Sequence, residues 1–412
     1  MRIALISFEF PPAVAIGGIG TYAWEAARML AEAGHDIEVF AAGITDYEPA
    51  NTYGIKVHRI DVTDRAHLRE AVVPVFAARH NELPFDVLES PEIGAEGAGI
   101  TSAFPDIAVV VKLHTPTYLV SKFSYEPPPL RNQVRFLAGS LRRGRIAWLH
   151  EPSYDPASDI ECLFTRVADV VAAPSYAIGT RVTSDWNLDP SRLTSFPCPF
   201  RQAEDLIALP LSSELKTVGF LGRLEARKGV VELARAIPSI LQEFPKLRFR
   251  FIGPTWPYQQ SDMESWIRHH CKAHVDNLHF VGAVSRAHLA AELAACDTVI
   301  LPSRWESFGL VCPESMTAGR AVIGSSAGGM AEIIEDGISG LLVPPNSPES
   351  ITRAVLSLAK NPDLVTRLAE AGRQRVLDLL APSVVLPFQV AAYRQAIERS
   401  KIRRNETNLT KP

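Results

Sequence analysis

Short apolar runs rich in branched residues alternate with stretches of helical periodicity along most of the chain. Residues 3–8 predict a buried strand, because they are almost continuously apolar. Residues 21–33 predict a helix with alanines and Leu30 on one face, and Gly34 ends that helix. Strands that alternate with helices pair in parallel, so the pattern predicts βαβ units and a parallel sheet. The further strands predicted in this series are 37–41, 55–60, 87–88, 107–113 and 170–173.

The same pattern begins again after a polar, irregular stretch at residues 201–213. We therefore expect an α/β protein with two doubly wound, Rossmann-like domains: residues 1–203, a linker at 204–215, and residues 216–383. Such sheets bind ligands at the carboxyl ends of their strands, so the active site is expected in the cleft between the domains. The second series comprises a helix at 230–241 and strands at 217–221, 247–252, 278–281, 298–301, 321–323 and 340–343.

Length and composition agree with a two-domain globular protein. The chain has 412 residues, whereas a single core stops growing at about 250–300 residues. With 47% hydrophobic and 21% charged residues, it is close to a globular average, which argues against disorder. Its 42 basic and 46 acidic residues give a net charge of −4, which excludes a globally basic nucleic-acid binder. The five cysteines form no CxxC pair, which indicates reduced thiols.

The densest chemical motif is RWESFGLVCPE at residues 304–314, which follows a predicted strand and leads into a predicted helix. The backbone N–H groups of residues 308–310 would face outward at a positive helix end, which suits a phosphate. Glu306 would lie in the loop, and Glu314, one turn into the helix, would accept hydrogen bonds from two ribose hydroxyls. The alternative is an acidic helix start that only favours the helix dipole.

A second motif, GFLGRLEARKG at residues 219–229, leaves the first strand of the second series. Arg223 and Lys228 lie on a glycine-flanked loop at the strand's carboxyl end, where two cations can reach one diphosphate. An isolated basic pair is more often a solvated loop, but the position at a strand end favours the diphosphate.

Two further features lie at strand ends of the first series. Glycine-rich residues 15–20 follow the first strand and let the backbone approach a ligand closely. They do not form GxGxxG, and no acidic residue closes the second strand, so nicotinamide binding is poorly supported. His114 ends the apolar strand 107–113, where a ligand contact belongs, although a lone histidine is more often structural.

The turn GSSAGGMAE at residues 324–332 also joins a strand to a helix. A sugar or phosphate contact and a plain strand-to-helix turn explain it equally well.

Together these motifs resemble the family 4 retaining glycosyltransferases of the GT-B fold, whose members move a sugar from a nucleotide diphosphate donor to an acceptor. The resemblance covers most of the chain. It departs at Met330, where the family often has proline, which leaves the geometry of that turn open. The roles that the resemblance implies are diphosphate binding by Arg223 and Lys228, ribose binding by Glu314, donor contacts by Glu306, Phe308, Gly309, Leu310 and His114, and approach to the diphosphate by the loop of Gly17 and Gly18.

A departing nucleoside diphosphate develops negative charge, which fixed cations and helix-end dipoles stabilise. The sequence has no Asp-x-Asp, and its nearest acidic pair, Asp36 and Glu38, opens a strand and is interpreted as structural. No cluster has metal-ligand spacing, so we expect metal-independent transfer without a cofactor. Retention without an evident carboxylate nucleophile suits front-face attack by the acceptor, as is commonly proposed for the family.

A basic segment, with Arg131, Arg135 and Arg142 on one face of a potential helix, stands in the acceptor-binding first half. It suits an anionic lipid surface or the phosphate of a lipid-linked acceptor, and a solvated basic helix is the slightly favoured alternative. The apolar start at residues 1–7 is too short for a signal peptide, and we expect no later run to reach membrane-spanning length. We expect a cytoplasmic protein, with peripheral contact at the inner membrane face as the membrane hypothesis.

Residues 384–400 predict a terminal helix, which in the GT-B fold crosses back onto the first domain. It would couple the domains and leave a hinge at the linker. The polar tail at residues 401–412 is expected to be disordered.

Two alternatives remain open. A nucleotide-sugar 2-epimerase shares the architecture, and a non-catalytic nucleotide-sugar-binding subunit would bind without transferring. The spacing of Glu306 and Glu314 favours the transferase over the epimerase. The presence of all four charged residues, Arg223, Lys228, Glu306 and Glu314, argues against the non-catalytic subunit. The transferred sugar is expected to be a hexose and the donor a UDP- or GDP-sugar, although the sequence does not distinguish the bases.

Overall fold

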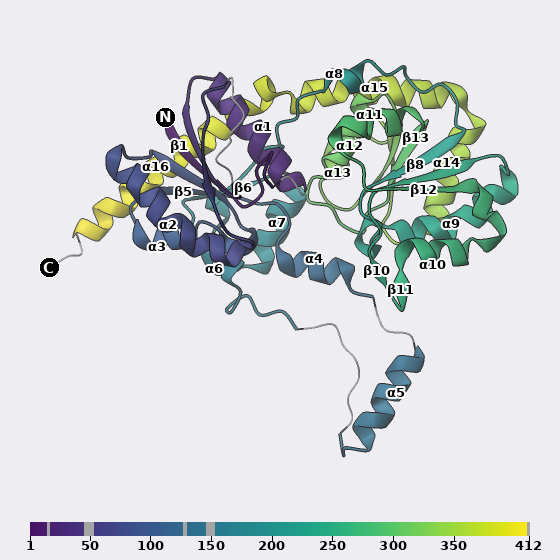
Figure 1. Cartoon of the computed structure of the whole chain (residues 1–412), viewed down its shortest axis with the longest axis horizontal. Coiled ribbons are helices and arrows are strands. Elements are labelled where there is room, and N and C mark those ends of the chain that lie inside the picture. The colour runs from purple at the N-terminus through teal and green to yellow at the C-terminus, as the bar shows by residue number, and fades with distance from the viewer. Residues whose placement is uncertain (15–16, 45–52, 127–129, 146–152, 410–412) are drawn as a thin grey trace.

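The structure, a computed structural model, describes residues 1–14, 17–44, 53–126, 130–145 and 153–409. Two lobes lie side by side, each with a parallel sheet covered by helices (Figure 1). The first sheet has the order β3-β2-β1-β4-β5-β6-β7. Its strands are β1 (Arg2–Ser7), β2 (Asp36–Ala42), β3 (Lys56–Ile60), β4 (Val87–Pro91), β5 (Ala108–Lys112), β6 (Val170–Ala173) and β7 (Leu193–Ser195).

The second sheet has the order β12-β9-β8-β13-β14-β15 and is also parallel. A short hairpin, β10–β11, stands beside it. The strands are β8 (Thr217–Leu221), β9 (Arg248–Ile252), β10 (Pro257–Tyr258), β11 (Ser261–Asp262), β12 (Leu278–Gly282), β13 (Thr298–Leu301), β14 (Ala321–Ser325) and β15 (Leu341–Val343). The predicted GT-B architecture of two doubly wound domains is confirmed. Residues 204–215, the predicted linker, lie between the sheets and include α8 (Glu204–Ile207).

Helices cover both faces of each sheet, which explains why the strands are apolar without alternation. In β1, Ala4 and Ile6 pack on one face with Phe76 of α2, while Ile3 and Leu5 pack on the other. The helices of the first lobe are α1 (Gly18–Glu32), α2 (Arg65–Glu82), α3 (Ala98–Ala103), α4 (Thr117–Ser124), α5 (Leu130–Leu141), α6 (Ile160–Arg166) and α7 (Tyr176–Asp185). Those of the second are α9 (Val230–Glu243), α10 (Met263–His270), α11 (Arg286–Ala294), α12 (Val311–Thr317), α13 (Met330–Ile333), α14 (Pro348–Lys360) and α15 (Pro362–Leu380).

The strand order reverses at one place in each sheet, between β1 and β4 in the first and between β8 and β13 in the second. The crevice at the carboxyl ends of such a pair is where doubly wound sheets bind ligands. The chain therefore has two such crevices, and the loops that leave them build the site described below.

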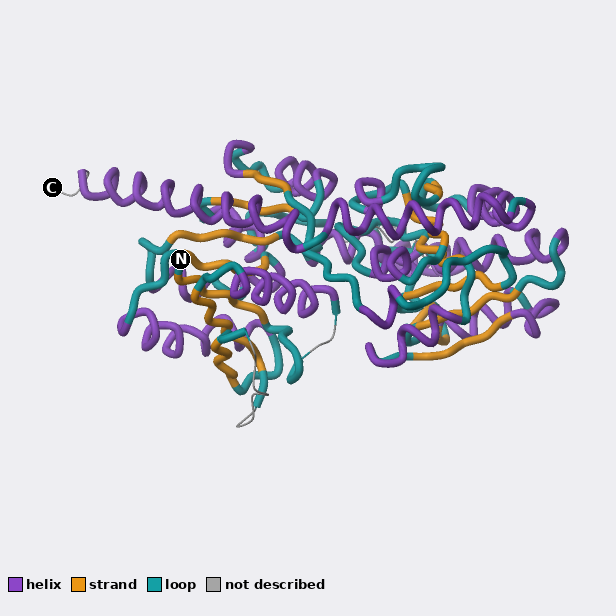
Figure 2. Tube along the Cα trace, turned by 90° about the horizontal axis from the view of Figure 1, so that it is seen from above, coloured by secondary structure: helices purple, strands orange, loops and turns teal. Residues whose placement is uncertain are grey.

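The last helix, α16 (Pro382–Leu409), returns to the first domain as predicted (Figures 1 and 2). Gln389 and Tyr393 of this helix bind the buried carboxylate of Glu89 at 3.2 and 2.8 Å. The prediction of a disordered tail from residue 401 is wrong for residues 401–409, which continue the helix. Arg404 donates to the carbonyl of Asp106, and such contacts give this polar end a partner that its sequence does not reveal.

One stretch within Pro362–Glu406 passes a length and hydropathy test for a membrane-crossing helix, with a mean hydropathy of 1.5. This corrects the expectation that no run is long enough. The structure breaks the stretch at Ala381, whose φ of −55° and ψ of 141° are not helical. Val385 and Ala392 are buried in the core of the first domain, so the apolar residues of α16 have a partner within the protein.

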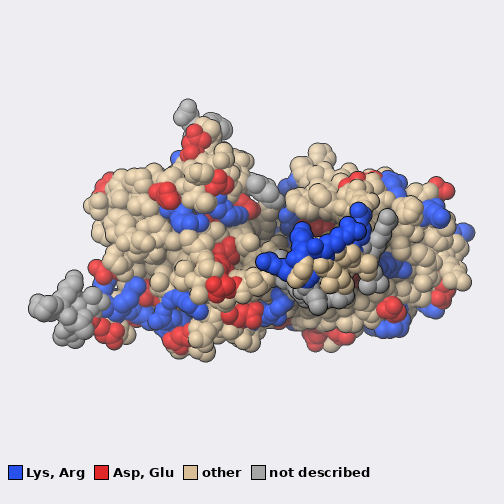
Figure 3. Space-filling model, turned by 90° about the horizontal axis from the view of Figure 1, so that it is seen from below, with Lys and Arg blue, Asp and Glu red and all other residues tan. Residues whose placement is uncertain are grey.

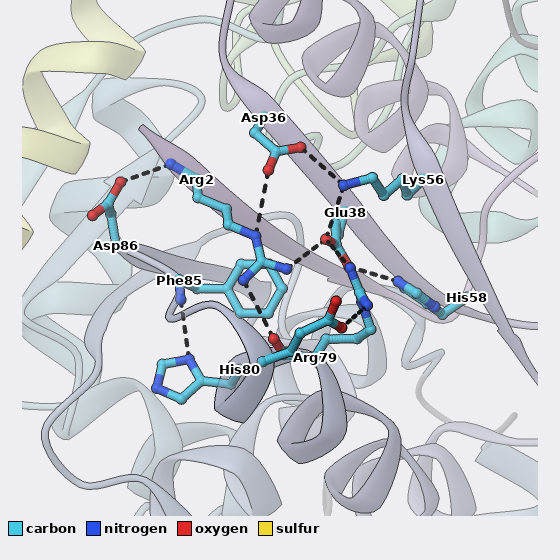
Figure 4. A network of polar contacts seen from close by, with 10 residues as sticks. Arg2, Asp36, Glu38, Lys56, His58, Arg79, His80, Phe85 and Asp86 are labelled. Atoms are coloured by element: carbon cyan, nitrogen blue, oxygen red, sulfur yellow. Dashed lines mark hydrogen bonds and ion pairs between the residues drawn. The ribbon is translucent and has the colours of Figure 1, made fainter.

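The acidic pair at the start of β2 takes part in a structural network (Figure 4). Glu38 is fully buried and binds Arg2 at 2.6 Å, His58 at 2.7 Å and Arg79 at 3.0 Å. Burial raises the pKa of Glu38, but these hydrogen bonds more than offset burial and lower it. Asp36 lies 3.4 Å from Arg2. Both carboxylates therefore neutralise cations at the amino end of the sheet, as their position suggested.

Candidate active site

The loop that leaves β8 presents Arg223 at the carboxyl end of the strand, where the sequence placed it. Its guanidinium donates to Glu225 at 3.1 Å and lies 5.3 Å from the ring of Trp256. The side chain is 45% exposed, so it remains accessible to a ligand in the cleft.

Lys228 is turned toward the end of β13 by the glycine that follows it. Gly229 has a φ of +73°, and a Cβ there would lie 1.9 Å from the carbonyl oxygen of Pro302, so only glycine fits. The Lys228 ammonium forms an ion pair with Oε2 of Glu306. Burial lowers the pKa of Lys228, although Glu306 acts in the opposite direction. The two predicted loops are thus joined by a charge pair between the ends of β8 and β13.

Glu306 is nearly buried and remains ionised. Burial raises its pKa, but the nearby ammonium of Lys228 and guanidinium of Arg227 outweigh burial and lower it. Arg227 lies 3.7 Å from Oε2 of Glu306 and 2.9 Å from Glu225. Arg227 carries no signal in the sequence, because nothing in its position within the motif distinguishes it from a solvated arginine. The structure buries it to 4% exposure, which makes it a third cation at this crevice.

The Gly328–Gly329 turn holds the loop of Glu306. A Cβ on Gly328 would lie 2.1 Å from the Glu306 carbonyl oxygen, and one on Gly329 would lie 2.2 Å from that of Ser307. The N–H of Gly329 donates to the Glu306 carbonyl at 2.7 Å. The two glycines therefore let one backbone pass close to the other, which is more than a plain turn requires. Met330, where the family often has proline, is buried and starts α13.

The segment 308–310 leads into α12, and Glu314 lies in the first turn of that helix, as predicted. Among the described residues, the hydrogen-bond network gives no partner to the N–H groups of Phe308, Gly309 and Leu310. Burial raises the pKa of Glu314 to about 7, although Arg286 acts in the opposite direction. This carboxyl group therefore changes charge near neutral pH.

His114 stands at the end of β5 in the first domain, beside Thr115, whose side chain contacts Ser307 of the second domain. The backbone N–H of His114 donates to the carboxylate of Glu92 at 2.8 Å, and its ring meets the edge of Tyr22 with 5.2 Å between ring centroids. Burial, reinforced by Lys112, lowers the pKa of His114 to about 3, so the imidazole is neutral at ordinary pH. Burial and then Glu161 raise the pKa of Glu92 to about 8. Glu92 was missed by the sequence analysis, although its place after β4 at the strand-order reversal is a signal that could have found it.

The two domains meet around these residues. Ser307 binds Thr115 side chain to side chain at 2.7 Å, and its carbonyl accepts from Ser175 at 2.7 Å. A Cβ on Gly18 would lie 3.6 Å from Leu310, so the glycine loop of the first domain faces the segment 308–310 of the second. Gly17 is exposed at the same helix start.

Further contacts tie the domains beside the cleft. Phe123 stacks on Trp305 with 5.2 Å between ring centroids and 3° between planes. Arg304 pairs with Glu126. Both contacts lie within a few residues of Glu306 and at the base of the segment that carries α5.

The basic segment forms α5, which stands apart from both domains (Figure 1). Arg135 and Arg142 are exposed, and basic side chains gather along this region (Figure 3). The side chain of Arg131 lies outside the described residues. On the same helix, Val134 and Leu141 are 59% and 54% exposed. The structure therefore places this basic surface outside the cleft, and not beside Lys228 and Glu306.

Within the described ranges, no group of three or more histidine, cysteine, aspartate or glutamate side chains is arranged to hold a metal ion. The positive charge at the β8–β13 crevice comes from the side chains of Arg223, Arg227 and Lys228.

Comparison with known proteins agrees with this geometry. Residues 202–375 match the family described as "Glycosyl transferases group 1", and residues 16–201 match "Glycosyltransferase Family 4". The chain belongs to this glycosyltransferase family. The glycogen synthase of Mycobacterium tuberculosis is 24% identical over 397 residues, which cover 91% of this chain and 90% of that protein.

Solved structures show the same GT-B fold as this glycosyltransferase. Sucrose-phosphate synthase from Thermosynechococcus elongatus has a TM-score of 0.72 and 22% identity, covering 96% of this chain and 98% of that one. HepE from Anabaena, solved in complex with UDP, has a TM-score of 0.65 and 18% identity, covering 95% and 98%.

Proposed function

We propose that this glycosyltransferase moves a hexose from a nucleotide diphosphate donor to a hydroxyl acceptor, with retention of the anomeric configuration. The observation that carries the proposal is the convergence of Arg223, Arg227 and Lys228 with Glu306 at the β8–β13 crevice, opposite His114. Three cations at one strand-end crevice suit the two charged phosphates of a leaving nucleoside diphosphate.

Transfer breaks the bond between the anomeric carbon and the diphosphate oxygen and forms a bond from that carbon to the acceptor oxygen. The diphosphate gains negative charge, which Arg223 and Lys228 stabilise in the place of a metal ion. Glu306 positions the Lys228 ammonium, which replaces part of its interaction with Glu306 by an interaction with the diphosphate. The N–H groups of residues 308–310 add further donors.

The contacts of Glu306 argue against a route through a covalent intermediate on its carboxylate. The carboxylate of Glu306 is engaged by Lys228 and Arg227, so it is poorly suited to attack the anomeric carbon. The neutral imidazole of His114 suits a hydrogen bond with a sugar hydroxyl. We infer front-face attack, in which the acceptor proton passes to the departing diphosphate oxygen.

We propose UDP or GDP as the nucleotide, with the ribose bound by Glu314 and no further cofactor. The UDP complex of HepE supports a uridine donor, since that protein shares the fold.

We further propose that α5 contacts anionic lipid, which places the enzyme at the inner face of the membrane. Exposed Arg135 and Arg142 would meet phosphate groups, while Val134 and Leu141 enter the headgroup boundary. The acceptor on this proposal is a sugar or a lipid-linked molecule.

A thermal-shift panel of UDP, GDP, ADP and dTDP tests the donor proposal. A ligand that binds only the folded state raises Tm by mass action. We expect one nucleotide to stabilise the wild-type protein and to lose this effect in Lys228→Ala. Stabilisation by none of them would overturn the proposal. Incubation with the nucleotide sugar alone separates the 2-epimerase, which converts the free donor, from the transferase.

A further inference from the structure

We propose that Glu9 binds the attacking hydroxyl of a neutral, polyhydroxylated acceptor at the β1–β4 crevice of the first domain. This inference rests on the proposed function, since it supplies the acceptor half of the same cleft. Glu9 follows β1, and Glu96 follows β4, so their carboxylates meet where the strand order reverses. The equivalent crevice of the second domain, between β8 and β13, carries the donor-side cations.

The Glu9 carboxylate is fixed by one oxygen and leaves the other free. Arg65 lies between two acids: it donates to Oε1 of Glu9 at 2.5 Å and also to Oε1 of Glu96. The second oxygen of Glu96 accepts from the N–H of Phe8 at 2.8 Å. Glu9 is only 8% exposed, and its Oε2 has no hydrogen-bond partner among the described residues. A buried carboxylate oxygen without a donor is costly, which points to a missing partner.

The free oxygen faces the start of α1. A Cβ on Gly17 would lie 3.5 Å from Oε2 of Glu9, and a Cβ on Gly20 would lie 3.2 Å from its Cβ. The α1 helix has 15 residues, and no side chain caps its first turn. Its first N–H groups therefore have no side-chain acceptor, and Oε2 of Glu9 has no donor. The neighbouring Gly18 faces Leu310 of the donor segment at 3.6 Å, so the place adjoins the transferred sugar.

A hydroxyl group fits this pair of neighbours. A single hydroxyl group can donate its hydrogen to Oε2 of Glu9 and accept a hydrogen bond from a first-turn N–H of α1. A phosphate would be repelled by the carboxylate, and an ammonium group could not accept from the helix.

Glu9 acts on this proposal as an acceptor-binding residue and not as a base. As the acceptor hydroxyl oxygen bonds to the anomeric carbon and the carbon–oxygen bond to the diphosphate breaks, the hydroxyl proton leaves its hydrogen bond with Oε2 of Glu9 and passes to the diphosphate oxygen. Glu9 orients the lone pair of the hydroxyl toward the anomeric carbon and is unchanged at the end.

The test compares Glu9→Ala with Glu96→Gln, which alters the other acid on Arg65 and serves as the matched control. Methyl α-glucoside, myo-inositol and glucose 1-phosphate are offered to the UDP-loaded protein, and binding is followed by saturation-transfer NMR. We expect a neutral polyol to bind the wild type and Glu96→Gln, and to bind Glu9→Ala about tenfold more weakly or not at all. The UDP thermal shift should stay the same in all three proteins.

The outcomes separate this inference from the donor proposal. Equal polyol binding by wild type and Glu9→Ala would show that Oε2 holds only water and would overturn it. So would binding of glucose 1-phosphate alone, or of no probe, by a wild-type protein that still responds to UDP. Loss of the UDP response in Glu9→Ala would indicate a structural role and also overturn it. A wild-type protein without any nucleotide response contradicts the donor proposal instead.

Discussion

The ammonium group of Lys228 pairs with Oε2 of Glu306 across 78 positions of sequence, between the ends of β8 and β13. Gly229 allows the approach, because any side chain there would collide with Pro302. The pair keeps a cation at the crevice in the absence of a ligand. On the proposed function, it is the point at which the donor diphosphate enters the charge network.

Replacement of Lys228 by alanine removes a cation that stabilises the leaving diphosphate. We expect turnover to fall by about 100-fold or more, since a fixed charge at a developing anion is worth that much. Lys216→Ala is the matched control, because Lys216 is 73% exposed at the opposite end of β8. Steady-state rates with the donor found by the nucleotide panel measure the effect. Near-normal turnover in Lys228→Ala would contradict the assignment.

Replacement of Glu306 by alanine leaves Lys228 and Arg227 without their shared carboxylate. Removing one partner of a fully buried pair costs about 3–5 kcal/mol, and here the two side chains keep 17% and 13% exposure. We therefore expect a lower Tm that the bound nucleotide raises by more than in the wild type, because the diphosphate restores the negative charge. Glu243→Ala, at the exposed pair with Lys360, should change neither value. A nucleotide response no larger than in the wild type speaks against the exchange.

Nucleotide affinity should rise with pH through the pKa of Glu314. Burial raises this pKa to about 7 in the folded protein, so the group is protonated below that pH and ionised above it. An ionised carboxylate accepts hydrogen bonds from both ribose hydroxyls, so binding strengthens from about pH 6 to about pH 8 and then levels off. In Glu314→Gln the titration between these limits should flatten. A pH dependence that survives in this variant excludes Glu314 as its source.

The Gly328–Gly329 turn should tolerate no side chain. Gly329→Ala places a Cβ 2.2 Å from the carbonyl of Ser307, so the donor loop must move. We expect transfer to fall by about tenfold or more while the protein stays folded by circular dichroism. Gly139→Ala in α5 is the control, since a Cβ there would have 4.0 Å to its nearest neighbour. Unchanged activity in Gly329→Ala would show that the loop position does not matter.

The lipid contact of α5 is testable by sedimentation with vesicles. Wild-type protein should bind vesicles rich in anionic lipid at low salt and lose them as salt rises, because exposed charges are screened. Arg135→Glu with Arg142→Glu should abolish binding without changing the nucleotide thermal shift. If wild-type protein ignores anionic vesicles, α5 is a solvated helix and the membrane proposal is wrong.

The fold and the position of the residues at the β8–β13 crevice were predictable because they follow local rules. Continuous apolar strands separated by helices fix a doubly wound sheet, and strand ends fix where ligands belong. Arg223, Lys228 and Glu306 all lie at such ends, so the sequence pointed to their place without showing their contacts. The pairing of Lys228 with Glu306 is a tertiary relationship that no spacing along the chain reveals.

Other residues of the site could not be predicted from the sequence, because their role depends on burial. In the sequence, Arg227 cannot be distinguished from a solvated arginine, and Glu9 and Glu92 cannot be distinguished from ordinary acidic loop residues. Only the fold shows that they are buried beside the points of strand-order reversal. The polar residues 401–409 looked disordered, since their partners, such as the Asp106 carbonyl, come from 298 positions away. Such long-range contacts are invisible to periodicity.

Calorimetric titration of the preferred nucleoside diphosphate tests the central claim most directly. We propose that the cations at the β8–β13 crevice bind the diphosphate. The double variant Arg223→Ala with Lys228→Ala should therefore weaken nucleoside diphosphate binding by about 100-fold. The corresponding nucleoside, which lacks phosphate, should bind both proteins equally. Equal binding of the diphosphate by the wild type and the double variant would contradict the account.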